Sequence, residues 1–164
     1  MSELNMILAA SENNAIGRKG GIPWHISEDF KFFKATTIGH TVIMGYMTWV
    51  SLGSKPLPDR QNYVISLEPL PVPQHDNVRF FASLEEAIAD AGDGAFIMGG
   101  GQTYRQALPM ATRIYLTRIH TVIEDADTFF PELPASEWKI TFSSGLKTDP
   151  KSNLKFEFLT YERI

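Results

Sequence analysis

Short apolar runs alternate with segments of helical character along this chain, and this alternation constrains its fold more than any other feature. Residues 4–10, 41–45, 62–66 and 95–98 are mostly apolar, as expected of strands buried on both faces of a sheet. Parallel neighbours in a sheet need crossover connections, and segments of helical character lie between these runs. The pattern therefore predicts an α/β fold with a mainly parallel central sheet and helices on both faces.

The end of the chain follows a different pattern. Residues 138–142 and 154–161 alternate between apolar and polar side chains, and a turn-rich segment joins them. This predicts an antiparallel C-terminal hairpin beside the parallel strands. No internal repeat or linker interrupts the 164 residues, so we expect a single domain over residues 1–164.

Composition disfavours several classes of function. The chain has 15 Lys and Arg against 19 Asp and Glu, a formal net charge of −4, and nucleic acid is not expected as a partner. Cysteine is absent, which excludes disulfides and thiolate metal ligands and suits the cytoplasm. No leader pattern is present, and no apolar stretch approaches the ~20 residues of a membrane span, so no membrane partner is expected. No metal is expected either, because metal-ligand spacing is lacking among His25, His40, His75 and His120.

Two predicted helices carry capping signals. Ser27 is predicted to be the N-cap of a short helix that contains Glu28 and Asp29 in its first turn. The residues from Ser83 read Ser-Leu-Glu-Glu, which is a capping box, and Gly92 is predicted to end that helix.

The two adjacent carboxylates of the first helix are predicted to have different surroundings. At 100° per residue, Glu28 shares a face with Lys31 and is expected in solvent. Asp29 shares a face with Phe32 and Phe33, which aims it at an aromatic surface. Burial of an unpaired carboxylate costs several kcal/mol and raises its pKa, which is usually tolerated where the group binds a ligand or takes part in chemistry. The alternative, an acidic residue that only favours the helix dipole, is equally compatible with this pattern.

Glycines stand at two predicted turns from a strand into a helix. Gly45 follows one apolar run, and Gly99, Gly100 and Gly101 follow another. Glycine allows close approach of the backbone, and the free amides at a helix start favour phosphate, so two such turns suit a dinucleotide. The spacing G-x-G-x-x-G, the G-x-S-x-G elbow and the Walker A loop are absent. A standard Rossmann dehydrogenase, a hydrolase and a kinase are therefore disfavoured.

A series of short motifs runs in a specific order along nearly the whole chain. The motifs are Ala9-Ala10, Ala15-Ile16-Gly17, Ile22-Pro23-Trp24, Asp29 with Phe32-Phe33-Lys34, Val42-Ile43-Met44-Gly45 with Thr48-Trp49 and Ser51-Leu52, Pro56-Leu57-Pro58 with Arg60, Met98-Gly99-Gly100-Gly101 with Tyr104, Tyr115-Leu116-Thr117, and Asp127-Thr128 with Phe130-Pro131. In this order and spacing the chain closely resembles the dihydrofolate reductase family of the bacterial single-domain type.

The resemblance implies reduction of 7,8-dihydrofolate to 5,6,7,8-tetrahydrofolate by hydride transfer from NADPH, which supplies one-carbon metabolism. Asp29, Trp24, Ile22 and Tyr104 would form the reacting end of the site. Asp29 would bind the pterin 2-amino group and the neighbouring ring nitrogen, Thr117 would hydrogen-bond the carboxylate, and Trp24 would hold a water. In this family the carboxylate orients the ring and raises the basicity of N5, with water as the immediate proton donor.

The same resemblance supplies the rest of the expected site. Arg60 would form a charge-assisted fork to the α-carboxylate of the glutamate tail, although by composition alone it is a solvated loop arginine. The substrate pocket would be lined by Ile7, Phe33, Lys34, Leu52, Leu57, Met98 and Thr117. The cofactor would contact Ala9, Ile16, Gly17, Gly45, Tyr46, Met47, Thr48, Ser66, Leu67, Gly99, Gly100, Gly101, Gln102, Thr103, Tyr104 and Thr128. Also implied are a cis peptide between Gly99 and Gly100, a lid over residues 11–23, antifolate inhibitors as ligands, and a monomer.

The chain departs from the family where the adenosine 2′-phosphate is usually held by arginine. Tyr46, Leu67 and Gln102 occupy those positions, and Glu68 adds an acidic neighbour. Each lost charge-assisted bond is worth about 1.5–3 kcal/mol, so we expect a smaller preference for NADPH over NADH than is usual in the family.

Two other functions remain open from the sequence. A pyrimidine reductase of riboflavin biosynthesis would share the fold, but Trp24, Asp29 and residues 56–60 argue against it. A non-catalytic nucleotide- or folate-binding module is the alternative from a different class, and the presence of Asp29 and Tyr104 argues against that.

Overall fold

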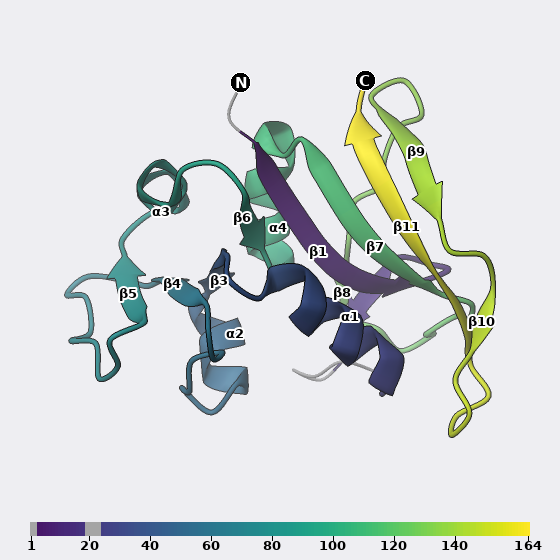
Figure 1. The fold of residues 1–164 in the computed structure, drawn as a ribbon, viewed down its shortest axis with the longest axis horizontal. Helices are drawn as coiled ribbons and strands as arrows, with labels where there is room; N and C mark the ends of the chain where they lie inside the picture. The colour runs from purple at the N-terminus through teal and green to yellow at the C-terminus, as the bar shows by residue number, and fades with distance from the viewer. Residues whose placement is uncertain (1–2, 19–23) are drawn as a thin grey trace.

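A central sheet organises the computed structural model, which describes residues 3–18 and 24–164 (Figure 1). In this part of the chain the sheet has nine strands. They are β1 (Leu4–Ser11), β3 (Thr41–Gly45), β4 (Gln61–Ile65), β5 (Val78–Phe81), β6 (Ala95–Ile97), β7 (Arg113–Ile119), β9 (Trp138–Ser143), β10 (Lys147–Thr148) and β11 (Lys155–Arg163). Their order in space is β10-β11-β7-β1-β6-β3-β4-β5, and β9 also pairs with β11.

The sheet is parallel except at one side. β1 is parallel to β6 and β7, and β3 is parallel to β4 and β6, while β5 is parallel to β4. β11 is antiparallel to β7, and both β9 and β10 are antiparallel to β11. The predicted C-terminal hairpin is therefore confirmed, and it extends the sheet beyond β7 (Figure 1).

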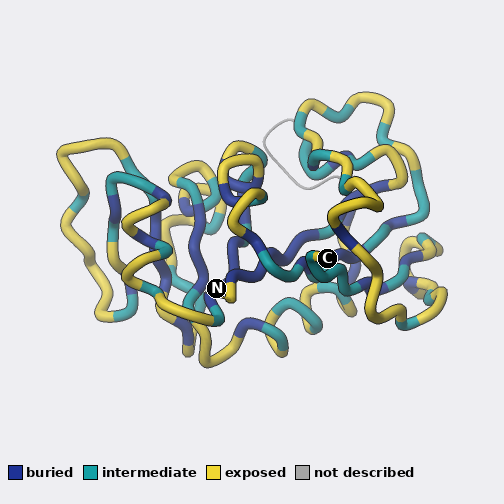
Figure 2. Tube along the Cα trace, turned by 90° about the horizontal axis from the view of Figure 1, so that it is seen from above, coloured by how far each residue is buried: buried dark blue, intermediate teal, exposed yellow. Residues whose placement is uncertain are grey.

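Successive side chains of the central strands enter different cores, which explains why these strands read as continuous apolar runs. On one face, Met6 and Leu8 of β1 pack with residues of α3 (Leu84–Ala91) and α4 (Gly101–Ala107). On the other face, Ile7 packs with residues of α1 (Ser27–Thr37) and α2 (Tyr46–Ser51). The predicted cover of helices on both faces is confirmed, and the buried parts of the trace run through the middle of the molecule (Figure 2).

One of the two predicted caps is wrong. The prediction that Ser27 caps α1 fails, because the helix begins at Ser27 and Ile26 occupies the cap position without a side-chain hydrogen bond. The Ile26 carbonyl accepts from the amides of Asp29 (3.1 Å) and Phe30 (3.3 Å). Its side chain is fully buried, so packing rather than capping chemistry sets where this helix starts. At α3 the prediction is confirmed, since the Ser83 hydroxyl accepts from the Glu86 amide at 3.2 Å.

Three short elements were not predicted from the sequence. β2 (Ala15–Gly17) pairs with β8 (Thr128–Phe129) in a separate two-stranded sheet. A single 3-10 turn, η1 (Leu108–Met110), follows α4. Strands of two or three residues are too short to show alternation, so sequence periodicity could not reveal them.

We find no described helix with the length and apolar character needed to cross a bilayer.

The two serines at helix starts provide a matched test of this account. Ser83→Ala should lower the free energy of unfolding by about 1 kcal/mol, because it removes an N-cap hydrogen bond. Ser27→Ala should change it by less than about 0.5 kcal/mol, because that side chain caps nothing. Urea denaturation measures both, and equal losses in the two variants would contradict the assigned caps.

Candidate active site

Asp29 lies in the first turn of α1 and is only partly accessible to solvent. The Thr117 hydroxyl, from the middle of β7, donates a 2.7 Å hydrogen bond to Asp29 Oδ1, as predicted. Burial raises the pKa of the Asp29 carboxyl above its usual value, and the hydrogen bond from Thr117 opposes that shift. Among the residues that the structure describes, no basic side chain forms an ion pair with this carboxylate. Asp29 therefore retains unused acceptor capacity in a poorly solvated position.

The neighbouring carboxylate has the opposite environment, as the helix periodicity predicted. Glu28 is exposed and forms a 3.1 Å ion pair with Lys147 rather than with Lys31. Phe32 and Phe33 lie on the buried side of α1, and Phe32 stacks on Phe158 of β11 with ring centroids 4.4 Å apart. The face that carries Asp29 is thus the face that packs on the sheet.

Register explains how Thr117 reaches Asp29. Thr117 pairs with Ala9 of β1 on one side and with Phe158 of β11 on the other, and its side chain is 2% exposed. A hydroxyl at this depth needs a partner, and the Asp29 carboxylate supplies one.

The apolar residues expected at the substrate pocket gather on the same sheet face. Ile7 is buried, and the others pack against its cluster while remaining partly exposed. These partly exposed members are Phe33, Leu52, Leu57 and Met98. Trp24 is buried in an adjacent cluster with Phe156 and Phe158. Lys34 lies on the exposed side of α1, and Ile22 lies outside the described residues.

Arg60 is built into the structure and is not a solvated loop residue. Its side chain is buried, with Nε donating to the Pro58 carbonyl at 2.9 Å and Nη1 donating to Thr37 Oγ1 at 3.0 Å. Burial lowers the pKa of the guanidinium from its ordinary value, and nearby Asp59 opposes this effect. Arginine nevertheless stays charged in proteins, and its five N–H donors exceed these two acceptors. The remaining donors can bind a carboxylate. Sequence reasoning missed Thr37, which carries no signal beyond that of an ordinary helical threonine.

Tyr104 connects the carboxylate to the glycine-rich part of the site. Its side chain is 5% exposed, and its hydroxyl donates to the Ile7 carbonyl at 2.8 Å. Burial raises the pKa of the Tyr104 phenol far above its ordinary value, and the negative charge of Asp29 adds to the effect. The phenol is therefore a neutral donor at every physiological pH.

The two glycine turns lie against each other. The Gly45 amide donates to the Gly99 carbonyl at 2.8 Å, and the Gly99-Gly100 peptide is cis, as the resemblance implied. A Cβ on Gly45 would lie 2.9 Å from Thr103 Oγ1, and one on Gly101 would lie 2.6 Å from Thr128 Cγ2. Any side chain at these two positions would collide with its neighbour.

Several other expected cofactor residues surround these turns. Thr48 Oγ1 lies 3.4 Å from where a Cβ on Gly99 would be, and Ile16 of β2 lies 3.7 Å from the equivalent point on Gly101. The Gly17 carbonyl accepts from the Asp127 amide at 3.1 Å. Ala9, in β1, is partly buried.

The expected adenosine end is apolar and open. Tyr46, Met47 and Leu67 are 44%, 76% and 88% exposed, and Gln102 is also exposed. The Ser66 hydroxyl lies 3.5 Å from the adjacent Leu67 carbonyl, and its amide donates to the Phe81 carbonyl at 2.8 Å. None of these positions carries a cation.

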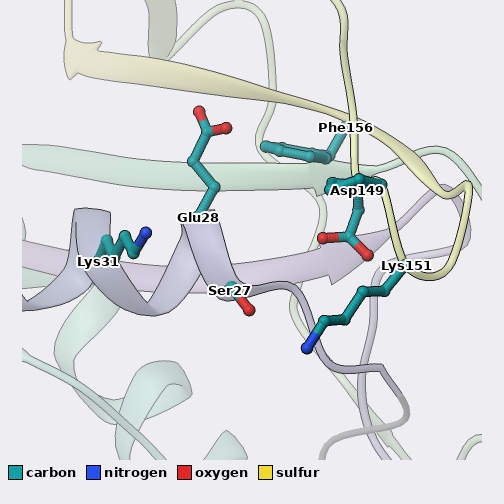
Figure 3. Close-up of a pocket in the computed structure, with 7 residues that line it drawn as sticks. Ser27, Glu28, Lys31, Asp149, Lys151 and Phe156 are labelled. Carbon is teal, nitrogen blue, oxygen red and sulfur yellow. The ribbon is translucent and has the colours of Figure 1, made fainter.

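A surface pocket of about 200 Å³ lies apart from this site (Figure 3). Lys151 extends toward the start of α1, and the Asp149 carboxylate accepts from the amide and hydroxyl of Ser152. The pocket includes neither Asp29 nor a glycine turn. Its lining residues are Ser27, Glu28, Lys31, Asp149, Pro150, Lys151 and Phe156.

Residues 3–18 and 24–164 contain no cluster of His, Asp and Glu that could hold a metal ion. The hydrogen-bond acceptors, donors and apolar walls of the site suit an organic ligand.

Comparisons with known proteins agree with this geometry. The family model described as dihydrofolate reductase matches residues 3–163. A dihydrofolate reductase of Neisseria meningitidis serogroup B is 41% identical over 169 residues, with 99% of each chain covered. A dihydrofolate reductase of Bacillus subtilis is 36% identical over 162 residues, with 98% of this chain and 94% of the relative covered. Among solved structures, dihydrofolate reductase from Enterococcus faecalis complexed with NADP(H) and RAB-propyl has a TM-score of 0.84 and 33% identity, covering 98% of this chain and 96% of its own.

The raised pKa of Asp29 predicts a pH-dependent effect on stability. Because the folded state binds this proton more tightly than the unfolded state, wild-type stability should fall as pH rises from the ordinary carboxyl value of 3.8 through the folded-state pKa. Asp29→Asn removes this loss, so the stability of the variant relative to wild type should increase over that window and then level off.

Urea denaturation at several pH values measures the difference. Glu28→Gln removes the same charge from the exposed neighbouring position and is the matched control. Parallel pH curves for wild type and Asp29→Asn would contradict the burial of the carboxylate.

Proposed function

The chain belongs to the dihydrofolate reductase family, and on this premise we propose that it reduces 7,8-dihydrofolate to 5,6,7,8-tetrahydrofolate as an NADPH-dependent oxidoreductase. The observation that carries the proposal is the Asp29 carboxylate, which lies on the buried face of α1 with Thr117 as its partner and, within residues 3–18 and 24–164, no basic side chain paired with it. A ligand with two adjacent N–H donors would satisfy it. The 2-amino group and neighbouring ring nitrogen of a pterin have that arrangement.

The walls of the site support the same substrate. The apolar cluster around Ile7, Phe33 and Leu57 would form apolar walls for the pterin and benzoyl groups. Arg60, held by Pro58 and Thr37, presents its remaining donors to the α-carboxylate of the glutamate tail. Antifolates with the same donor pattern would bind in the same place.

The glycine turns fit a dinucleotide, because glycine allows a close approach of the backbone at the starts of α2 and α4, where threonine side chains leave no room for a Cβ on Gly45 or Gly101. Backbone amides at the starts of α2 and α4 would meet the phosphates, with the hydroxyls of Thr48, Thr103 and Thr128 beside them. When bound, NADPH supplies the hydride that reduces the pterin ring. The buried Tyr104, neutral and fixed on the Ile7 carbonyl, closes the wall between cofactor and substrate.

Asp29 acts on the reaction by binding rather than by direct proton delivery. Its charge fixes the ring orientation and raises the basicity of the ring nitrogen that must be protonated. Trp24 positions a water near the carboxylate, and water delivers the proton. The enzyme works as a single-domain monomer in the cytoplasm. The absence of cysteine suits that reducing compartment.

Replacement of Asp29 tests the function directly. Asp29→Asn should keep the fold and the Thr117 contact but lower kcat/KM with dihydrofolate by about 10²-fold or more, the range of a group that assists proton transfer. The measurement is the loss of NADPH absorbance in the presence of dihydrofolate. Glu28→Gln, one residue away and exposed, is the matched control and should keep wild-type activity.

Near-normal turnover by Asp29→Asn would contradict the role proposed for this residue. Absence of turnover in the wild-type protein would instead favour a non-catalytic folate- or nucleotide-binding module.

The apolar adenosine end predicts weak discrimination between cofactors. We expect a kcat/KM preference for NADPH over NADH well below several hundredfold, because Tyr46, Leu67 and Gln102 offer no cation to the 2′-phosphate. Tyr46→Arg should increase the preference by about tenfold or more, since a charge-assisted hydrogen bond contributes about 1.5–3 kcal/mol.

Steady-state kinetics with both cofactors measure the ratio. Gln61→Arg adds the same charge at the start of β4, the end away from Leu67, and should leave the ratio of kcat/KM for NADPH to that for NADH unchanged. A preference of several hundredfold in the wild-type protein would refute the expectation.

A further inference from the structure

His120, directly after β7, lies between two carboxylates. Its Nδ1 is 3.2 Å from Glu12 Oε1, and its Nε2 is 3.2 Å from Glu157 Oε1. Glu12 belongs to the turn after β1, whereas Glu157 belongs to β11. The imidazole therefore joins two segments that are far apart in the sequence.

The chemistry of the three groups fixes which form of His120 makes both contacts. Ionised carboxylates only accept hydrogen bonds, and a neutral imidazole has one N–H donor. In the neutral ring one nitrogen lone pair would face a carboxylate oxygen at 3.2 Å, which is repulsive. The imidazolium donates from both nitrogens and satisfies both partners. This bridge is complete only when the ring carries two protons.

The bridge lies at the base of a segment that leads to the candidate active site. The Glu12 amide donates to the Thr121 carbonyl at 2.9 Å. Asn13 holds Ile123 by two bonds, donating to its carbonyl at 3.0 Å and accepting from its amide at 3.2 Å. Beyond them, β2 pairs with β8, next to Gly101 of the glycine turn.

Other charged groups face this cluster from each neighbouring element. Arg118 of β7 stands opposite Glu157 in the register and donates to the Ser11 carbonyl at 2.7 Å and to Asn14 Oδ1 at 2.8 Å. Glu132 lines a surface pocket together with Glu12 and Arg118. The second oxygen of Glu157 accepts from Ser143 of β9 at 3.3 Å. Of these groups, histidine is the type whose charge normally changes between pH 5 and 8.

We propose that protonated His120 is a positioning residue, which fastens the base of the loop after β1 to β11 and so helps to hold β2 against the glycine turn. When the ring loses a proton, one carboxylate loses its donor. Glu12 is the one released, since its side chain is 49% exposed against 25% for Glu157, which keeps its bond to Ser143. The anchoring is present at low pH and is lost as pH rises. The effect of this anchoring on catalysis rests on the proposed function, whereas the bridge between Glu12, His120 and Glu157 is independent of that function.

The bridge is tested first in the protein without ligands. Nitrogen NMR of the histidine rings reports their protonation, and amide exchange at Glu12 reports anchoring of the loop base. The ring N–H protons of His120 should exchange with solvent more slowly in the wild-type protein than in the Glu12→Gln, Glu157→Gln double variant, because the two carboxylates accept charge-assisted hydrogen bonds from both nitrogens. The protection factor of the Glu12 amide is its intrinsic exchange rate divided by its measured rate. Between pH 6 and 8 this factor should fall by about two- to fivefold, as expected for partly exposed ion pairs.

His120→Gln should abolish that pH dependence, and His75→Gln, in an exposed loop, should behave as wild type. Equal exchange rates of the His120 ring protons in the wild-type protein and the double variant would overturn the proposal. Unchanged pH dependence of Glu12 protection in His120→Gln would overturn it equally.

Catalysis is tested by the rate of hydride transfer in single-turnover experiments. The ratio of wild-type to His120→Gln rates should fall from about threefold at pH 6 to about one at pH 8, the scale of a partly exposed ion pair. A ratio that does not change with pH would overturn the positioning role. Failure of the wild-type protein to reduce dihydrofolate would refute the proposed function and leave the NMR test of the bridge intact.

Discussion

The site depends on a carboxylate that lies on the buried face of α1 and forms no ion pair with any basic side chain that the structure describes. Asp29 is partly removed from water, and the hydrogen bond from Thr117 does not offset the loss of hydration, so the pKa of its carboxyl is raised. The rest of the structure makes this placement possible. Parallel pairing of β1 with β7 puts Thr117 beside Ala9, and the aromatic side of α1 packs on the sheet and carries Asp29 with it. A ligand that donates two hydrogen bonds relieves the cost.

A second constraint operates at the carboxyl ends of β3 and β6. The two glycine turns are so close that the Gly45 amide donates to the Gly99 carbonyl and a Cβ on Gly45 would collide with Thr103 of α4. This contact joins the starts of α2 and α4 and places backbone amides, not side chains, on the surface that a dinucleotide would meet. Tyr104 lies between the two constraints, because its ring approaches Gly99 while its phenol binds the Ile7 carbonyl.

Sequence periodicity was sufficient where a feature depends on many residues. The central strands, the helices on both faces and the contrast between Glu28 and Asp29 follow from alternation and from the helix repeat. Periodicity failed for features set by a few contacts. It could not decide whether Ser27 or Ile26 occupies the cap, because burial of Ile26 determines the start of α1. It could not find β2 and β8, which are too short, and it could not show that Arg60 is buried against Thr37, a partner from another element. The specific roles of Asp29 and Arg60 follow from the family resemblance, whereas the glycine turns by themselves indicated a dinucleotide.

The central claim is that Asp29 is the polar anchor for the pterin ring, and a crystal structure of the protein with folate and NADP⁺ tests it most directly. The account predicts both Asp29 oxygens at hydrogen-bonding distance, about 2.7–3.2 Å, from the 2-amino group and the adjacent ring nitrogen. It also predicts the Thr117 contact retained, and the nicotinamide beside the glycine turn that contains Gly99. A pterin ring bound elsewhere, or bound with its 2-amino group turned away from Asp29, would contradict it.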